Sequence, residues 1–343
     1  MKLKNIYERM KHYNVSGLSI AEIDNGQISN TECFGLLEAG TNNKVNSNSI
    51  FNACSISKFL TAMLVMKLTE QGILDLDEDV NNMLSSWKVP HNELTKSKKV
   101  TLRNLLSHQS GIIDPEGSFT EFNPINGYPS MVELLEGRTS YCKLAIEVQY
   151  EPESDFQYSD AGFCIIQQLI EDVTGKPFKK VMTELIFKPL LMENSTLEMT
   201  ILEDKIENIS CGHNKNGELV DRKYPIYPYP AASGLLTTPS DIAILVIELM
   251  NALKGESKFG FSATRSKEII NSQGCKEWTG LGLFLDHSEQ EVEISSLGWG
   301  IGFQCMMVAY PYLETGVVIM TNTDLGVHQL EGIIGEIYNS LTT

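Results

Sequence analysis

The chain has 343 residues, of which 42% are hydrophobic and 21% charged, and its formal net charge at pH 7 is −17. This composition is typical of a globular protein with enough residues to bury a large core. The negative charge argues against nucleic acids and anionic membranes as partners, because binding to phosphate groups requires clustered lysine and arginine side chains.

The sequence also disfavours a membrane protein and a protein held together by disulfides or zinc. No run of about 18 apolar residues occurs, so we expect no transmembrane span. Residues 1–10 lack the apolar core of a signal peptide, which predicts a cytoplasmic location. The seven cysteines are scattered, without a Cys-x-x-Cys pair. This pattern favours reduced, buried thiols over a disulfide framework or a zinc site.

The chain begins with the pattern of a helix followed by a hairpin. Residues 2–13 are predicted to form a short amphipathic helix. Residues 15–23 alternate as a strand does, Asp24-Asn25-Gly26 is typical of a hairpin turn, and residues 28–35 are predicted to return as a second strand.

Ser55 and Lys58 stand three residues apart, before the apolar residues 59–68, which are predicted to form a largely buried helix. Residues three apart share one face of a helix, so the hydroxyl and the amine can meet. A lysine whose pKa is lowered by burial can supply the base that a serine nucleophile needs. The alternative is a serine at a helix start followed by an exposed lysine, and the pair alone does not decide between them.

Further along, residues 102–107 are predicted to form a short helix that runs into His108. We interpret His108 as a structural residue that ties down a turn rather than as a catalytic base, because no partner carboxylate is near it in the sequence. Residues 113–150 are rich in Pro, Gly and Ser, which predicts loops that could form one wall of a substrate cleft.

Tyr158-Ser159-Asp160 repeats the design at Ser55, because this polar triplet also opens an apolar helix, here over residues 163–173. Tyr158 could act as an acid or base if a nearby cation lowered its pKa. The alternative is a core tyrosine with a hydrogen-bonded hydroxyl. After a connector rich in Tyr and Pro, Thr238 is predicted to cap a helix over residues 242–253.

The last hundred residues are predicted to be mostly strands, at 280–285, 291–297, 303–310 and 316–321, followed by a helix at 327–341. Strands therefore occupy both ends of the chain. The predicted fold class is α+β, similar to an α/β sandwich, with one antiparallel sheet built from both chain ends, flanking terminal helices and a large inserted helical region. We expect a single unit, 1–343, with a sheet subdomain (1–54 plus about 240–343) and a helical subdomain (about 55–239).

Five segments stand in an order that resembles the serine β-lactamase and penicillin-binding-protein superfamily. Within that superfamily they resemble the branch of class C β-lactamases, D-amino-acid peptidases and esterases, and the resemblance covers nearly the whole chain. Ser55–Lys58 matches Ser-x-x-Lys, and Tyr158–Asp160 matches Tyr-x-Asn with Asp in the third place. The other matches are Leu105–Gly111 with Leu-Leu-x-His-x-Ser-Gly, Gly234–Asp241 with Gly-Leu-x-Ser-x-x-x-Asp, and Ser296–Phe303 at the place of Lys-Thr-Gly or His-x-Gly.

The resemblance implies a serine hydrolase that cleaves an ester or an amide of a small molecule or peptide through an acyl-enzyme. Ser55 would be the nucleophile, and Lys58 and Tyr158 would share the proton transfers. The backbone N–H groups of Ser55 and Trp299 would form the oxyanion hole, with Gly298 beside it. No metal or organic cofactor is implied. The alternative is a domain that has lost catalysis and acts as a binding or sensor module.

Two positions depart from the family pattern. Asp160 places a carboxylate where the family has an amide, which would raise the pKa of a nearby Lys58 and favour Tyr158 as the base. Ser296 replaces the Lys or His of the third motif, so recognition of a substrate carboxylate is not expected. Trp278-Thr279-Gly280 is similar to Lys-Thr-Gly, but it precedes the wrong strand, and we interpret it as structural.

Overall fold

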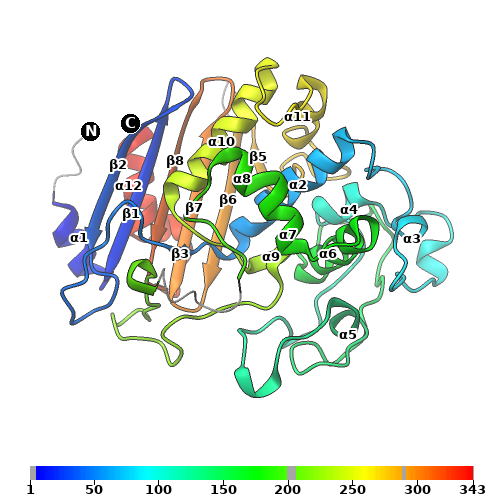
Figure 1. The fold of residues 1–343 in the computed structure, drawn as a ribbon, viewed down its shortest axis with the longest axis horizontal. Helices are drawn as coiled ribbons and strands as arrows, with labels where there is room; N and C mark the ends of the chain where they lie inside the picture. Colours follow the sequence, from blue (N-terminus) through cyan, green and yellow to red (C-terminus); the bar gives the residue numbers. More distant parts are fainter. Residues whose placement is uncertain (1–4, 199–205, 288–290, 343) are drawn as a thin grey trace.

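A six-stranded antiparallel sheet with the order β2-β1-β8-β7-β6-β5 dominates one side of the molecule (Figure 1). The computed structural model describes residues 5–198, 206–287 and 291–342. Strand β1 from the start of the chain pairs with β8 from its end, so the sheet is built from both termini, as predicted. The strands are β1 (Gly17–Asp24), β2 (Gln27–Gly35), β5 (Phe284–Asp286), β6 (Glu293–Gly300), β7 (Phe303–Tyr310) and β8 (Thr315–Thr321).

The predicted hairpin turn between β1 and β2 is confirmed. Asp24 pairs with Gln27, which leaves Asn25 and Gly26 as a two-residue loop. Both residues have positive φ, 51° and 67°, as the tightest hairpin turns require.

Each face of the sheet is covered by helices (Figure 1). Val317 and Ile319 of β8 contribute to a hydrophobic cluster with α1 (Ile6–His12) and α12 (Ile333–Thr342). Val318 and Met320 face the other way, into the main core, on the side where α10 (Pro239–Lys254) crosses the sheet. The period-two alternation of these strands therefore separates two cores. Thr238 caps α10, as predicted, and accepts a hydrogen bond from the backbone of Asp241.

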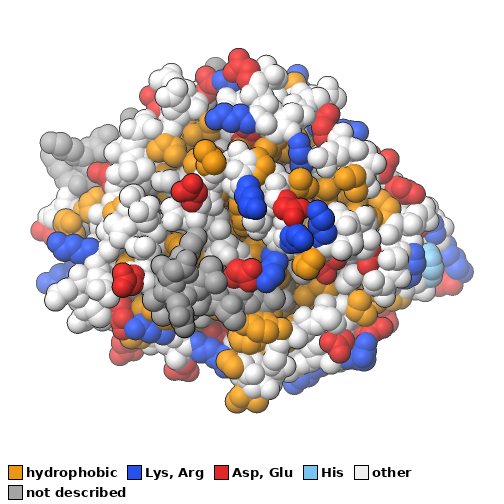
Figure 2. Space-filling view, viewed as in Figure 1, with side chains coloured by type: hydrophobic (Ala, Val, Ile, Leu, Met, Phe, Trp, Pro, Cys, Tyr) orange, Lys and Arg blue, Asp and Glu red, His pale blue; other side chains and the backbone are white. Residues whose placement is uncertain are grey.

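Lysine and arginine side chains are scattered on the face shown in Figure 2, several of them beside acidic ones, and they form no broad basic surface there. Among the described residues, no helix is both long enough and apolar enough to cross a membrane.

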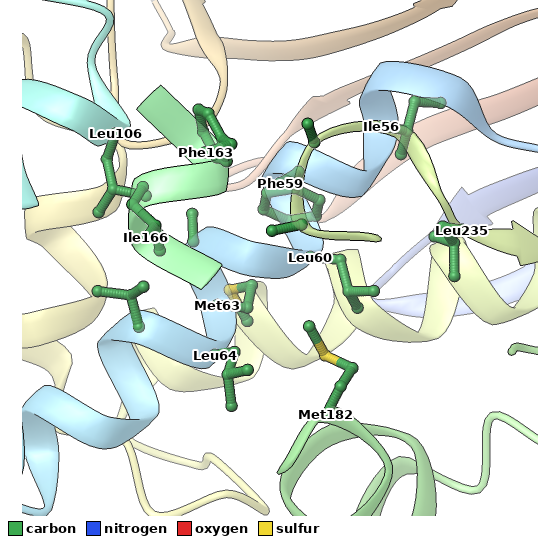
Figure 3. Packing of buried hydrophobic residues seen from close by; sticks show 14 of the residues in the cluster. Ile56, Phe59, Leu60, Met63, Leu64, Leu106, Phe163, Ile166, Met182 and Leu235 are labelled. Carbon is green, nitrogen blue, oxygen red and sulfur yellow. The ribbon is translucent and has the colours of Figure 1, made fainter. Parts of the chain in front are cut away.

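Helix α2 (Ser57–Glu70) lies at the centre of the inserted region and is buried on nearly all sides. Figure 3 shows Phe59, Leu60 and Met63 of this helix among side chains from neighbouring helices, including Phe163 and Ile166 of α6 (Asp160–Thr174). A helix that is apolar all round can only be stable in such an interior position. The other α-helices and strands in the described residues are α3 (Val80–Met83), α4 (Leu102–Leu106), α5 (Met131–Leu135), α7 (Phe178–Met182), α8 (Lys188–Leu190), α9 (Pro230–Ser233), α11 (Ala263–Ile269), β3 (Phe51–Asn52) and β4 (Leu236–Thr237).

One hydrophobic cluster runs from the inner face of the sheet through α10 and α2 to α6. The sheet and the helical region therefore share a core. The boundaries predicted for two subdomains, near residues 54 and 240, stay a prediction.

Two predicted strands needed correction. The strand predicted at 280–285 is wrong over its first part, because Gly280 donates to the carbonyl of Leu283 at 3.0 Å and Gly282 has φ of 72°. These four residues form a tight turn, and only Phe284–Asp286 is a strand. The strand predicted at 291–297 instead begins at Glu293 and continues to Gly300, because its pairing with β7 persists through the glycines.

Candidate active site

Ser55 lies in a short 3₁₀ turn, Cys54–Ile56, that leads directly into α2. Cys54 has φ of 48°, in the left-handed region that residues with side chains rarely adopt. Two polar side chains hold this turn: Asn52 Oδ1 accepts from the Cys54 N–H at 2.9 Å, and Ser57 Oγ donates to the Cys54 carbonyl at 2.6 Å. Strained backbone that is fixed in this way occurs often at functional sites.

The amine of Lys58 is surrounded by three acceptors. Nζ lies 3.3 Å from Ser55 Oγ, 2.6 Å from Asp160 Oδ1 and 3.0 Å from the carbonyl oxygen of Ala232. An ammonium group has three donors and no acceptor, so these three partners suit the protonated lysine. Only 2% of Lys58 is exposed.

The electrostatics of the site agree with a charged Lys58. Burial alone would lower the pKa of this amine, but the opposing effects of Asp160 and Tyr158 are larger, and the pKa lies above its ordinary value. The buried Lys58 and the partly buried Asp160 therefore form an ion pair, as the sequence predicted for a carboxylate at this position.

Tyr158 brings the phenol group to the same place. The Nζ of Lys58 lies 4.7 Å from the centroid of the Tyr158 ring. Tyr158 is 37% exposed, and partial removal of its hydroxyl from solvent at the site raises its pKa. The charge of Lys58 and hydrogen bonding with Lys58 and Ser55 act in the opposite direction. A pKa lowered by a nearby cation, the condition stated above for Tyr158, is therefore not met, because desolvation outweighs the charge of Lys58.

Asp114 fixes the start of α6 and with it the position of Asp160. Its carboxylate accepts from Ser159 Oγ at 2.8 Å, from the Asp160 N–H at 2.8 Å and from the Ala161 N–H at 2.9 Å. The first backbone N–H groups of a helix have no partner within the helix, and a carboxylate satisfies them well. Asp114 lies in the loop-rich segment, and no pattern in the sequence singled it out.

His108 packs beside Tyr158 and supports the loop before α6. Its Nδ1 accepts from the Ser159 N–H at 3.1 Å, and its ring stacks on Tyr158 with 4.3 Å between centroids. Burial and the charge of Lys58 hold the pKa of His108 well below its usual value, so the ring is neutral. These contacts agree with the interpretation of His108 as a structural residue.

Strand β6 runs beside the nucleophile turn and forms the opposite wall. A Cβ atom on Gly298 would lie 2.3 Å from the carbonyl oxygen of Ala53, so only glycine allows this approach. Ser296, on the same face of the strand, is buried against the site. The Trp299 side chain is 45% exposed, and its Nε1 donates to Asp324 at 2.8 Å.

A small cavity of about 20 Å³ lies between these groups. Six of its lining residues come from the predicted motifs, and three come from the turn before β5 and from the first residue of that strand. The described residues that line it are Ser55, Lys58, His108, Tyr158, Gly282, Leu283, Phe284, Ser296 and Leu297.

The predicted residues Ser55, Lys58, Tyr158, Asp160 and Ser296 are thus brought together, and Gly298 and Trp299 lie on the adjoining strand. Sequence reasoning missed the groups that hold them: the Ala232 carbonyl, Asp114, Asn52 and Ser57. A helix-capping pattern could have indicated a partner for the start of α6. A backbone carbonyl such as that of Ala232 leaves no signal in the residue type.

The sheet built from both termini and the Ser55–Lys58–Tyr158 cluster define the class of protein. The chain belongs to the beta-lactamase family, whose model matches residues 4–332.

Among curated proteins, the chain is similar to "Protein flp" of Staphylococcus aureus strain N315, with 22% identity over 329 residues that cover 93% of this chain and 62% of that protein. It is also similar to "Penicillin-binding protein 4*" of Bacillus subtilis strain 168, with 24% identity over 347 residues, which cover 94% and 71% of the two chains. The chain spans about three fifths of the length of the staphylococcal relatives.

The fold is shared with solved structures, of which two serve as examples. The octameric penicillin-binding protein homologue from Pyrococcus abyssi has a TM-score of 0.77 at 21% identity, covering 100% of this chain and 78% of its own. The D-amino acid amidase from Ochrobactrum anthropi SV3, complexed with L-phenylalanine, has a TM-score of 0.74 at 22% identity, covering 97% and 96% of the two chains.

Proposed function

We propose that this chain is a serine hydrolase that cleaves an ester or an amide of a small molecule or peptide through an acyl-enzyme on Ser55. The observation that carries the proposal is the meeting of three groups from distant segments. Lys58 Nζ lies 3.3 Å from Ser55 Oγ and 4.7 Å from the ring centroid of Tyr158. Covalent catalysis by a serine requires a neighbouring group that can accept the hydroxyl proton.

In the proposed acylation step, Ser55 Oγ attacks the substrate carbonyl carbon and its proton passes to the oxygen of Tyr158. The negative charge that develops on the carbonyl oxygen is stabilised by the backbone N–H groups of Ser55 and Trp299. Removing a donor of this kind typically lowers the rate by about 10²–10³. Gly298 supports the arrangement, because it lets β6 approach the nucleophile turn.

When the tetrahedral intermediate collapses, the bond from carbon to the leaving group breaks, and Tyr158 returns its proton to that leaving group. Water then attacks the acyl ester, releases the carboxylic acid and restores the Ser55 hydroxyl. The same phenol group serves both half-reactions, since it lies beside the nucleophile.

We assign the base to Tyr158 rather than to Lys58. The lysine donates to Asp160, to Ala232 and to Ser55, so its amine has no lone pair available. Its positive charge instead stabilises the phenolate form of Tyr158, although burial still holds the Tyr158 pKa above its ordinary value. Activity should therefore rise as the pH becomes alkaline.

A second candidate function is binding without catalysis, which the serine at position 296 favours because the family motif has a cation there. One experiment separates the two functions. Hydrolysis of p-nitrophenyl acetate should be measured for the native chain, for Ser55→Ala and for the exposed control Ser97→Ala. We expect turnover by the native chain and the control, with loss in Ser55→Ala. Equal rates in all three would refute the role of Ser55, and absence of turnover would favour the binding module.

A further inference from the structure

A group of aromatic side chains extends from the cavity at Ser55, and one of them, Phe284, belongs to the cavity lining. We call Phe156, Trp278 and Phe284 the aromatic rim. The ring centroids of Phe156 and Trp278 are 4.5 Å apart, those of Trp278 and Phe284 6.0 Å, and those of Phe156 and Phe284 6.4 Å. Trp278 is 43% exposed. A tryptophan exposed beside a cavity adds apolar surface that a ligand could cover.

The rim is continuous with the proposed catalytic groups. Phe156 contacts the ring of His108 at 5.6 Å between centroids, and His108 stacks on Tyr158 at 4.3 Å. Phe284 itself lines the cavity together with Ser55 and Ser296. In the sheet it pairs with Ser295, which places it next to the position where the family motif carries a cation.

The charges around this end of the cavity do not suit an anion. Among the residues that line the cavity, Lys58 is ion-paired with Asp160 at 2.6 Å, and His108 is neutral because burial and the charge of Lys58 lower its pKa. Lys276, two residues before Trp278, is ion-paired with Asp155 at 2.8 Å. A substrate carboxylate that bound at this end would lose hydration. The described cavity lining would not compensate for this loss, because its one charged lysine is already paired with Asp160.

From these contacts we infer that the aromatic rim binds the leaving group of the substrate, and that this leaving group is an uncharged aromatic or bulky apolar alcohol or amine. The inference rests on the proposed function, in which Tyr158 protonates the leaving group. The leaving group must then lie on the Tyr158 side of the scissile bond, which is the side that the rim borders. Stacking against Trp278 and Phe284 would orient it for that proton transfer.

Three acetate esters test the inference: benzyl acetate, ethyl acetate and 4-carboxybenzyl acetate. All three give the same acetyl-enzyme, so differences in kcat/KM report acylation and leaving-group binding alone. We expect kcat/KM for benzyl acetate to exceed that for each of the other two by at least about tenfold. Trp278→Ala and Phe284→Ala should each lower the benzyl-to-ethyl ratio by about tenfold, whereas Tyr312→Ala, which removes an exposed aromatic from the turn after β7, should leave the ratio unchanged.

An unchanged ratio in both rim variants, or a preference for 4-carboxybenzyl acetate, would overturn the inference. Turnover that survives in Ser55→Ala would instead overturn the proposed function. A second measurement needs no turnover: saturation-transfer NMR should detect benzyl alcohol, but not ethanol, bound to the native chain. We expect this signal to be lost in Trp278→Ala, and its absence from the native chain would also overturn the inference.

Discussion

Lys58 donates a hydrogen bond of 2.6 Å to Asp160, and only 2% of the lysine is exposed to solvent. This ion pair raises the pKa of the lysine against the effect of burial. It keeps the amine protonated next to Ser55 Oγ, so the lysine acts as a hydrogen-bond donor and a positive charge. We therefore propose Tyr158, and not Lys58, as the general base.

Asp160→Asn tests this division of roles. The charge of Asp160 raises the pKa of both Lys58 and Tyr158. Removing that charge lowers both pKa values, so Tyr158 loses its proton at a lower pH. We expect the rising limb of the profile of kcat/KM against pH to move to lower pH. Asp172→Asn, which removes a carboxylate near the far end of α6, is the matched control and should leave the limb in place. A limb that stays or moves to higher pH in Asp160→Asn would contradict the assignment.

Tyr158→Phe removes the phenol oxygen and keeps the ring that stacks on His108. We expect kcat/KM to fall by at least about 10², the range usual for the loss of a general acid or base. The kcat/KM that remains in the variant should no longer increase with pH in the alkaline range. Tyr312→Phe changes an exposed tyrosine on the turn after β7 and serves as the control. Activity within a factor of two of the native chain in Tyr158→Phe would remove this residue from the mechanism.

His108→Asn distinguishes a structural histidine from a base. Asparagine tolerates the positive φ of 58° at this position and carries an oxygen that can accept a hydrogen bond. Because burial and the charge of Lys58 hold the pKa of His108 well below its usual value, its charge does not change near neutral pH. We expect kcat/KM within about tenfold of the native value, less than the loss usual for a general base, and the same alkaline limb. The disappearance of that limb would show that His108 takes part in proton transfer.

Gly298→Ala tests the contact between β6 and the nucleophile turn. The added methyl group would lie 2.3 Å from the Ala53 carbonyl oxygen, so the strand must move away from Ser55. We expect a loss of about 1–3 kcal/mol in the free energy of unfolding, together with loss of esterase activity. Gly162→Ala is the control, because its nearest new contact is an ordinary 3.6 Å to Leu105. Thermal unfolding and ester hydrolysis check both variants, and full activity in Gly298→Ala would contradict the proposed geometry.

The sheet could be predicted because its strands alternate between two cores. Val317 and Ile319 face the terminal helices while Val318 and Met320 face the main core, so both faces are apolar and the sequence shows a short continuous apolar run that favours a strand. The strand predicted at 280–285 was wrong for a related reason. Leu281 and Leu283 are apolar and buried, but they belong to a tight turn, and apolar character alone does not separate the two.

The spacing of Ser55 and Lys58 follows from local helix geometry, so the sequence could predict their contact. The meeting with Tyr158 is a contact between distant segments, and its prediction depended on the resemblance to a family. The partners that fix the site could not be predicted. Ala232 contributes only a backbone carbonyl, and Asp114 lies in a loop without periodicity.

The proposed mechanism requires that Ser55 is the residue that becomes acylated. The most direct measurement is intact-protein mass spectrometry after incubation with a fluorophosphonate probe, followed by peptide mapping of the adduct. We expect one adduct per chain, located on Ser55, with none in Ser55→Ala and undiminished labelling in Ser97→Ala. Labelling of Ser55→Ala to the same extent as the native chain would contradict this mechanism.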